Sequence, residues 1–377
     1  MGRDIDWFKV YGLAWFLSGL SNSIYYTYSR PYLRETLGLA GYYAVSLLIV
    51  AEQAPLLMGI FTGFLADRIG RRKLLLLGLL NSPLYLLLGL INPWYIPLLV
   101  ALISLNNSLS GPAGLGVVLD AVNRSGKAYS LIAMAAALGW TFGGIVPGLL
   151  KDVIGTYGLF LSVALLAIIP PILQYIFYPS GKVVYRRVGY RELFRAISLT
   201  KYLSLSLILS TASLSLYYNL VALRIYDEIK NLLVFGLFFS SITALAGALM
   251  RPLAGYLVDK SDPWRIFVIS LTLYLFLDTA IYFSSGYIAL ILYVTPIYPF
   301  RDTATTILYS RTLSRELQAT AAGLITTSTS LAGLLILILT PLIKGNLYLA
   351  YIIHMLLIIA SIILLTIRKY KTITNAQ

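Results

Sequence analysis

Ionisable side chains inside long apolar runs are the residues of this sequence best suited to chemistry. Glu52 lies in such a run, and Arg301 and Asp302 lie next to each other in another. A charge at the centre of a bilayer costs about 2.5–3.5 kcal/mol on insertion scales, so each is by default a functional hypothesis. A carboxylate among apolar side chains favours its protonated form, which suits a group that takes up and releases protons. We predict proton exchange at Glu52 and Asp302; for Glu52, the alternative is a structural pairing with a hydroxyl group of a neighbouring helix.

Arg301 and Asp302 cannot simply neutralise each other on a helix, because adjacent residues point about 100° apart. At least one of them is therefore expected to meet a partner on another helix, a solute or water. An arginine in a dry cavity suits a carboxylate or phosphate group. The pair is therefore predicted to be functional.

The amino-acid composition indicates which environment surrounds the elements that hold these residues. Of the 377 residues, 59% are hydrophobic and 12% are charged, and the mean hydropathy is +0.82. Soluble domains carry about 25% charged residues, so most of this chain must face lipid. The net charge of +14 falls in short loops between apolar runs, where it orients the chain in the membrane, and we expect no nucleic-acid partner. Because the sequence has no cysteine and a single histidine, we predict no disulfide, metal or cofactor.

Twelve apolar runs are long enough to cross a membrane, since a spanning helix needs about 20 residues. They are residues 8–33, 41–66, 73–91, 94–119, 128–150, 156–178, 202–226, 232–258, 266–284, 287–310, 319–343 and 346–368. An even number puts both termini on one side, and most of the 29 Lys and Arg residues lie on that side. By the positive-inside rule both termini are cytoplasmic, in a multi-pass protein of the cytoplasmic membrane.

Two segments recur at the same offset of 192 residues. The run SNSIYY at 21–26 returns as SLSLYY at 213–218, and GFLAD at 63–67 returns as GYLVD at 255–259. Two matches at one offset, close to half the chain length, predict duplicated six-helix bundles, which we assign to residues 1–178 and 202–377. Since six is even, the two bundles have the same orientation, and a solute site is expected between them.

Residues 179–201 form the longest loop and join the two predicted bundles. Six basic residues face a single acid, Glu192, and Tyr190, Phe194 and Ile197 have helical spacing. This pattern predicts a short amphipathic helix on the cytoplasmic membrane surface, held by anionic lipid. An unstructured basic linker is the alternative.

The loop after the second run reads GFLADRIGRRK at 63–73 and combines two glycines, an aspartate and several basic residues. It closely resembles the signature loop between the second and third helices of the major facilitator superfamily. The number of spans, the basic central loop and the half-chain repeat extend the resemblance to the whole chain. It implies an all-α fold of twelve transmembrane helices in two bundles, which moves a small solute by alternating access.

In that family this loop belongs to a charged cluster that closes the cytoplasmic side, and the resemblance implies the same role here. Asp67 ends a helix, where the negative pole of the helix dipole requires a cationic or helix N-terminal partner. The arginines of the loop require acidic partners, and Asp120 is the candidate partner. The predicted gating residues are Gly63, Asp67, Arg68, Gly70, Arg71, Arg72, Asp120, Gly255 and Asp259. The alternative is that these charges only orient the chain in the membrane.

Two further segments depart from the family's pattern. The second copy of the loop lacks the Gly-Arg-Arg core, so its cluster is expected to be weaker, with Arg251 and Arg315 as candidate partners of Asp259. The fifth run carries GWTFGGIVPG at 139–148, which resembles the fifth-helix motif of the family's drug/proton antiporters, although Gly143-Gly144 replaces the expected Gly-Pro pair. This favours efflux, but ordinary helix packing accounts for small residues equally well.

In the family the first, fourth, seventh and tenth helices line a central cavity, and the resemblance places their polar residues there. The residues predicted to bind the solute are Asn22, Tyr25, Tyr26, Asn106, Asn107, Tyr217, Tyr218, Tyr298, Arg301 and Asp302. The fourth helix lacks the arginine that proton-coupled members often carry, which weakens the case for proton coupling. Asp278 and His354 belong to peripheral helices, where we expect structural hydrogen bonds.

We predict a monomeric secondary active transporter that moves a small solute across the cytoplasmic membrane, coupled to protons and exporting amphipathic compounds. Uptake or exchange of a polar or anionic metabolite, such as a sugar, organic acid or phosphate ester, is the alternative. An enzyme is disfavoured because only scattered carboxylates are available for catalysis. An ATP-driven pump is disfavoured because SGKA at 125–128 lacks the upstream glycine and the following Ser/Thr of a P-loop. A receptor or lipid scramblase with the same fold stays open, because fold does not determine function.

Overall fold

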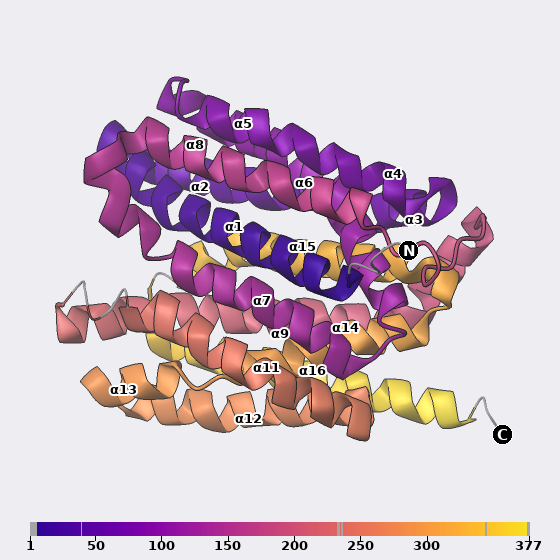
Figure 1. The fold of residues 1–377 in the computed structure, drawn as a ribbon. Coiled ribbons are helices and arrows are strands. Elements are labelled where there is room, and N and C mark those ends of the chain that lie inside the picture. The colour runs from indigo at the N-terminus through magenta and orange to yellow at the C-terminus, as the bar shows by residue number, and fades with distance from the viewer. Residues whose placement is uncertain (1–5, 39, 232–233, 235–236, 344, 375–377) are drawn as a thin grey trace.

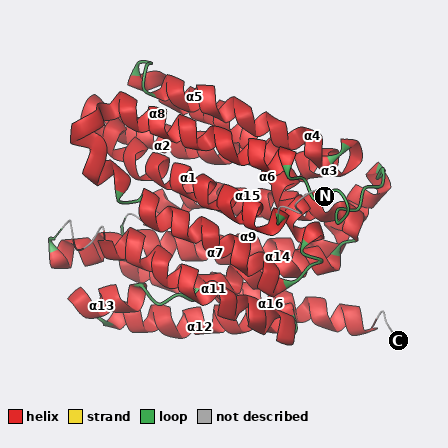
Figure 2. Cartoon of the chain, in the orientation of Figure 1, coloured by secondary structure: helices red, strands yellow, loops and turns green. Residues whose placement is uncertain are grey.

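The computed structural model describes residues 6–38, 40–231, 234, 237–343 and 345–374, and every regular element among them is a helix (Figure 2). Helices satisfy their backbone hydrogen bonds internally, which is the condition for crossing lipid. The all-helical prediction is therefore confirmed for this part of the chain.

The elements before the central loop are α1 (Trp7–Leu37), α2 (Ala40–Gln53), η1 (Ala54–Met58), α3 (Gly59–Ile69), α4 (Arg71–Leu75), η2 (Leu76–Leu80), α5 (Asn81–Leu88), η3 (Pro93–Tyr95), α6 (Ile96–Ala121), α7 (Gly126–Gly143) and α8 (Val146–Ile176). Those after it are α9 (Tyr190–Ile229), η4 (Leu237–Ile242), α11 (Thr243–Lys260), α12 (Pro263–Phe283), α13 (Gly286–Tyr293), α14 (Tyr298–Thr312), η5 (Arg315–Leu317), α15 (Gln318–Ile343) and α16 (Leu347–Thr374). Several of these starts are capped by a side chain that accepts a backbone N–H, among them the side chains of Asp6, Asn92, Ser125 and Asp262.

Eight stretches of the described residues are long and apolar enough to span a membrane. They are Ala44–Ile69, Pro93–Ala121, Val146–Ile176, Tyr190–Ile229, Leu237–Lys260, Pro263–Phe283, Arg315–Ile343 and Leu347–Ile367. The other predicted spans coincide with helical elements that are less apolar, shorter or interrupted: α1, the series α4–η2–α5, α7, and the pair α13 and α14. The chain is therefore a multi-pass membrane protein, while the count of twelve and the sidedness of its termini stay predictions.

Two elements differ from the predicted boundaries. The turn expected between the fifth and sixth spans lies inside α8, at Gly155, whose positive φ of 66° suits glycine. Helix α9 begins at Tyr190 and continues for 40 residues to Ile229. The amphipathic segment is therefore the first part of α9 rather than a separate helix, and its place on the membrane surface stays a prediction.

The tenth predicted span is divided. Helix α13 ends at Tyr293 and α14 begins at Tyr298, with Pro296 between them. Proline has no backbone N–H and its ring collides with the preceding turn, so it does not continue a helix. The break lies directly before Arg301 and Asp302 and places them in the first turns of α14.

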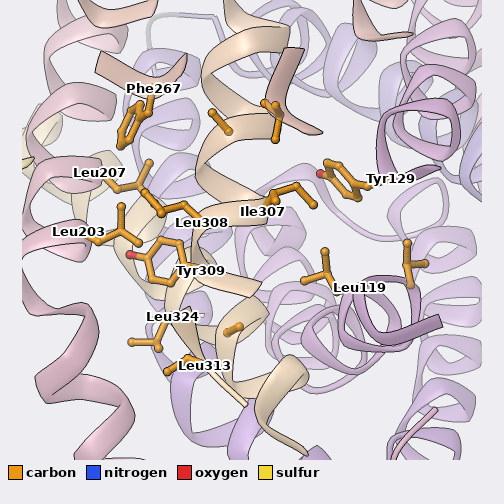
Figure 3. Close-up of a cluster of buried hydrophobic side chains, with 14 of the residues drawn as sticks. Leu119, Tyr129, Leu203, Leu207, Phe267, Ile307, Leu308, Tyr309, Leu313 and Leu324 are labelled. Carbon is orange, nitrogen blue, oxygen red and sulfur yellow. The ribbon is translucent and has the colours of Figure 1, made fainter. Parts of the chain in front are cut away.

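Helices α1 to α8, here the N-terminal group, pack on one another, and so do α9 to α16, the C-terminal group (Figure 1). The groups meet where α3 and α6 contact α15, and where α7 contacts α11. Figure 3 shows part of the shared core, with Ile307 and Leu308 of α14 between Leu207 of α9 and Tyr129 of α7. Because lipid is as apolar as these side chains, close packing rather than transfer from water favours this contact.

Candidate functional site

Asp67 joins the two groups through the start of α15. Its carboxylate accepts hydrogen bonds from Ala319 N at 3.1 Å, from Thr320 N at 2.7 Å and from the Thr320 hydroxyl at 2.7 Å. These N–H groups belong to the first turn of a helix, where the dipole favours an anion. Asp67 thus has the helix N-terminal partner that its position required.

Gly63, one turn before Asp67, allows α3 to approach α15 closely. A Cβ at Gly63 or at Gly116 of α6 would collide with Ala319. Gly70 takes a φ of 106°, which side chains rarely adopt, so the turn after Asp67 depends on glycine. These glycines permit the close contact that the carboxylate then holds together.

Arg71 and Asp120 extend this contact into a buried charge network. Arg71 Nε lies 2.8 Å from Asp67 Oδ1, and Arg71 Nη1 lies 3.1 Å from Asp120 Oδ2. Arg315, from the C-terminal group, places its Nε 2.8 Å from Asp120 Oδ1, and Val184 N of the central loop donates to Asp120 at 2.6 Å. The prediction that Arg71 pairs with Asp120 is confirmed.

Arg68 and Arg72 do not follow the prediction of acidic partners. Arg68 lies over the ring of Tyr190, 4.9 Å from its centroid. Arg72 lies over Tyr175 at 4.5 Å and donates to its carbonyl at 3.2 Å. Of these three arginines only Arg71 points into the interface between the groups, and Arg68 and Arg72 place their planar heads on aromatic faces instead.

Asp259 makes the equivalent contact in the second copy. It accepts from the Ser125 hydroxyl at 2.8 Å and from the N–H groups of Gly126 and Lys127 at 2.7 and 2.9 Å, at the start of α7. The backbone of the SGKA segment therefore binds a carboxylate of its own chain. Gly255 packs directly against Gly126, as Gly63 does against Ala319.

The predicted cationic partners of Asp259 are wrong. Its partner is Arg311, whose Nη2 lies 2.7 Å from Asp259 Oδ1. Arg251 begins two helical turns away on α11, about 12 Å along the axis, and reaches Asp302 instead. Arg315 is taken by Asp120. Burial lowers the pKa of nearby Arg124, and the positive charge of Arg315 lowers it further, which reflects the crowding of cations at this end.

These contacts close the end of the molecule that carries Asp67 and Asp259, here the Asp67 end. Farther along the same interface, Thr327 Oγ1 accepts from Ile60 N at 2.9 Å and Ser330 donates to the Gln53 carbonyl at 2.5 Å. The contact between α3, η1 and α15 therefore extends from Asp67 to Gln53.

Three cavities lie between the closed Asp67 end and the opposite end of the molecule. The central cavity, about 480 Å³, lies between the two groups and is lined mainly by aromatic and small residues: Trp15, Tyr129, Ala133, Ala136, Ala137, Trp140, Phe239, Thr243, Ala244, Arg251 and Tyr298. The N-terminal cavity, about 300 Å³, is lined by Asn22, Asn81, Asn107 and Gln174 among others. The C-terminal cavity, about 270 Å³, is lined by Tyr218, Tyr298, Arg301 and Asp302 among others.

Six of the ten residues predicted to bind the solute line a cavity, and four do not. Asn22 and Asn107 line the N-terminal cavity, and Tyr218, Tyr298, Arg301 and Asp302 line the C-terminal cavity. The remaining four lie outside the cavity linings and are engaged in contacts between helices: Tyr25, Tyr26, Asn106 and Tyr217. Their role in binding stays a prediction.

Arg301 and Asp302 contact each other, contrary to the argument from helical angles. Arg301 Nη2 lies 3.2 Å from Asp302 Oδ1 because the long arginine side chain folds back along the first turns of α14. Arg251 Nη2 approaches Asp302 Oδ2 at 3.9 Å and its guanidinium lies over Tyr298 at 5.7 Å. Asp302 thus has two arginines near it, Arg301 in the lining of the C-terminal cavity and Arg251 in the lining of the central cavity.

The apolar neighbours of Glu52 in the sequence indicated an isolated carboxylate, but Glu52 has two partners in the structure. Arg30 of α1 lies 2.7 Å from its carboxylate, and Tyr25 donates to it at 3.1 Å. Arg30 lies near the end of the first predicted span, and α1 continues past it to Leu37 and holds Arg30 against Glu52. Arg30 also lies over Tyr26, whose ring stacks on Trp140 of the central cavity.

Among the described residues, no group of three or more His, Cys, Asp and Glu could hold a metal ion. Sequence reasoning missed Arg30 and Arg311 as ion-pair partners, and it assigned Arg251 to Asp259 and not to Asp302. The signal available was the excess of arginines that lie within or next to apolar runs, but nothing in the sequence paired them with particular acids.

Comparison with known proteins agrees with this architecture. The family model of the Major Facilitator Superfamily matches residues 11–337. A protein of Serratia proteamaculans named multidrug resistance protein MdtG is 29% identical over 71% of this chain and 70% of its own length. The Yersinia enterocolitica protein of the same name is 24% identical over 72% of this chain and 70% of its own length.

Two solved structures share the fold. The human organic anion transporter MFSD10 superposes with a TM-score of 0.77 at 13% identity, covering 97% of this chain and 100% of its own. The Escherichia coli fucose:proton symporter FucP superposes with a TM-score of 0.72 at 14% identity, covering 97% of this chain and 99% of its own. With its signature loop built into a closed interface between two groups of helices, the chain belongs to the Major Facilitator Superfamily of transporters.

Proposed function

We propose that the protein is a secondary active transporter of the cytoplasmic membrane that carries a small amphipathic solute by alternating access. The observation that carries this proposal is the pair of matching contacts at the Asp67 end, where Asp67 binds the start of α15 and Asp259 binds the start of α7. Both contacts join one group to the other, so both must break when this end opens. The positive-inside rule places this end in the cytoplasm.

Alternating access follows from how the contacts are distributed. Residues 1–178 and 202–377 move as two bundles, joined by the basic segment 179–201, whose arginines and lysines bind anionic lipid. The state described has the cytoplasmic end closed and the cavities above it. A monomer contains both bundles and is sufficient for this cycle.

Efflux of amphipathic compounds is the preferred direction and substrate class. The central cavity combines Trp15, Trp140, Tyr129 and Phe239 with few charges, and aromatic faces bind apolar bodies without demanding one geometry. The curated relatives are named multidrug resistance proteins, which supports the same class.

Proton coupling is proposed at Glu52 and Asp302. Each carboxylate is paired with arginine in the state described, so protonation requires that the arginine leaves. Arg30 is one-third exposed and can turn to water, and an anionic group of a solute could take Arg301 from Asp302. Proton uptake would then follow a change in these pairs.

A second candidate function is transport of an organic anion or another polar metabolite. The excess of positive charge from Arg251 and Arg301 over Asp302 favours a carboxylate or phosphate group near Tyr298, which lines both the central and the C-terminal cavity. Replacing Arg301 with glutamine would weaken anion transport and leave cation transport unchanged if this group binds the solute.

Transport by proteoliposomes tests both functions. Ethidium serves as an amphipathic cation and fluorescein as an organic anion, each measured with and without an imposed pH gradient. Movement of ethidium against its gradient, driven by pH, supports proton-coupled efflux, whereas movement of fluorescein alone supports the second candidate. A thermal-shift screen against a solute library would extend the search, because a ligand that binds the folded state stabilises it. No flux of any solute that binds, under any gradient, would refute the transporter proposal.

A further inference from the structure

The N-terminal cavity contains polar groups to which the proposed cycle assigns no role. It lies within the N-terminal group, between α1, α5, α6, α7 and α8. Among the described residues that line it, none is an Asp, Glu, Lys, Arg or His. Four of its side chains are carboxamides from four different helices: Asn22 of α1, Asn81 of α5, Asn107 of α6 and Gln174 of α8. The cavity is therefore polar but uncharged.

Two of these carboxamides have no partner within the described part of the chain. The side chains of Asn22 and Gln174 make no hydrogen bond to another described residue, and neither is among the polar groups buried away from solvent without a partner. Their polar atoms are therefore open to the cavity. A polar group withdrawn from water is costly unless it is hydrogen-bonded, so these amides require water or a solute there.

Asn107 belongs to a chain of three carboxamides whose direction is fixed at one end. Asn106 Nδ2 donates to the Leu77 carbonyl at 2.6 Å and to Asn81 Oδ1 at 2.8 Å. A backbone carbonyl can only accept, so the Asn106 atom beside it is the NH₂ group, and the Asn81 atom that faces this group is the oxygen. Asn81 Nδ2 then donates to Asn107 Oδ1 at 2.6 Å. The free end of the chain is the NH₂ group of Asn107, which presents its donors to the cavity.

Helix α8 adds a backbone acceptor to the same wall. Pro170 and Pro171 have no N–H, so the carbonyls of Leu166 and Ala167 lack the partner that a helix usually provides. Ala167 and both prolines line the cavity. The cavity thus combines donors with acceptors and has no charge to neutralise an ion. Hydroxyl and amide groups match it, because they donate and accept without carrying a charge.

Polar groups of the peripheral helices differ, because they have partners inside the protein. Tyr218 donates to Asp278 Oδ1 at 2.7 Å, and the Ser213 hydroxyl oxygen lies 2.8 Å from His354 Nδ1. Asp278 and His354 also lie side by side, with Oδ2 and Nε2 2.9 Å apart. Structural hydrogen bonds were expected for these two residues and are present. The open carboxamides are therefore a property of the N-terminal cavity.

The N-terminal cavity is continuous with the proposed site for the apolar part of the solute. Trp15, Ala136 and Trp140 line both this cavity and the central cavity. A solute that lies against the two tryptophans therefore reaches the carboxamides with a group attached to its apolar body. The central cavity binds apolar surface, and the N-terminal cavity binds a polar substituent.

We propose that the N-terminal cavity binds an uncharged group rich in hydroxyls or amides, carried by a solute whose apolar body lies in the central cavity. The proposal rests on the transporter function proposed above and specifies its substrate class as neutral amphipathic compounds. It differs from the organic anion considered above, whose acidic group would lie near Arg251 and Arg301.

Three coumarins that differ in one substituent test this substrate class. Methylumbelliferyl glucoside carries a neutral hydroxylated group, the glucuronide carries a carboxylate in place of one CH₂OH group, and methylumbelliferone methyl ether carries only a methyl group. Their binding to the full chain in nanodiscs is measured by isothermal titration calorimetry, with empty nanodiscs as the blank. We expect the glucoside to bind about tenfold more tightly than either of the others, because it alone adds several neutral hydrogen bonds.

Each comparison can contradict the proposal. A glucuronide that binds as tightly as the glucoside, or more tightly, would place the polar group near the arginines. A methyl ether that binds as tightly as the glucoside would show that the carboxamides contribute no hydrogen bonds to the solute.

Asn22→Leu and Gln174→Met assign the binding to this cavity. Neither amide has a partner in the protein, so both variants should fold. Each should weaken binding of the glucoside by about two- to tenfold, the effect of one neutral hydrogen bond, and leave binding of the methyl ether unchanged. Asn346→Leu, the same change at an exposed asparagine at the start of α16, is the control and should bind both compounds like the wild type. Glucoside binding that is unchanged in both cavity variants would exclude this site.

Transport separates this proposal from the transporter function on which it rests. A protein that moves ethidium in proteoliposomes but binds the glucoside no better than the methyl ether would lose this substrate class and keep its function as a transporter. A protein that binds the glucoside through Asn22 and Gln174 but moves no solute would keep the binding site, and the transporter proposal would be refuted.

Discussion

The contact between Asp67 and α15 allows a quantitative prediction for Asp67→Asn. Three hydrogen bonds cross from Asp67 to the other group, at 2.7–3.1 Å. The bond from Arg71 to Asp67 stays within the N-terminal group and does not distinguish the closed from the open state. Hydrogen bonds to a charged group contribute about 1.5–3 kcal/mol each.

Asparagine keeps one acceptor oxygen, and at the Oδ2 position this oxygen can still accept from both Thr320 donors. The bond from Ala319 N is then lost, and the other two lose their charged acceptor. With about 1.5 kcal/mol for the lost bond and about 0.5–1 kcal/mol for each weakened one, we expect the closed state to lose about 3 kcal/mol relative to the open state. This corresponds to a shift of about a hundredfold in their ratio. A population that is nearly all closed would become visibly mixed.

Distances between spin labels measure this ratio. Because the chain has no cysteine, Lys73→Cys and Lys260→Cys can be labelled directly, one in each group near the Asp67 end. Asp67→Asn should add or enlarge a population with a longer distance. Asp152→Asn, the same change at an exposed aspartate of α8, is the control and should leave the distribution unchanged. If Asp67→Asn also leaves it unchanged, the contact does not hold this end closed.

Three further predictions follow from the same interfaces. Asp259→Asn should open this end by a smaller factor than Asp67→Asn, because its side chain is 30% exposed and water can replace its bonds; an equal or larger shift between the spin labels would contradict this. Gly63→Val should prevent the close approach of α3 to Ala319 and populate the open distance even with Asp67 intact, whereas an unchanged distribution would show that the helices can adapt. Glu52→Gln should abolish proton dependence in proteoliposomes and leave solute exchange, and proton-driven transport equal to that of the wild type would assign coupling elsewhere, with Asp302 the next variant to measure.

Some of the site could be predicted because it depends on local sequence. The loop at 63–73 combines a helix end, two glycines and a basic set within a few residues, so a helix N-terminal or cationic partner was expected for Asp67 and an acidic partner, Asp120, for the arginines. The offset of 192 residues linked Asp67 with Asp259, and the structure gives both carboxylates a helix N-terminus as partner.

The ion pairs could not be predicted in the same way. Glu52 finds Arg30, Asp302 finds Arg251 and Asp259 finds Arg311, each across two helices. Which arginine meets which acid depends on how each helix is rotated about its axis and how far it is shifted along its neighbour. Long arginine side chains reach several positions, so spacing in the sequence does not select among them.

The sequence by itself determined that the chain crosses a membrane, that it is helical and which family it resembles, because apolar length, charge distribution and a short motif are local properties. Only the tertiary structure decided that the Asp67 end is closed, that three cavities lie above it and that Asp278 meets His354. These features come from contacts between helices far apart in the chain. Packing in lipid selects those contacts through shape and hydrogen bonding rather than through apolar periodicity, which is satisfied on every face of a membrane helix.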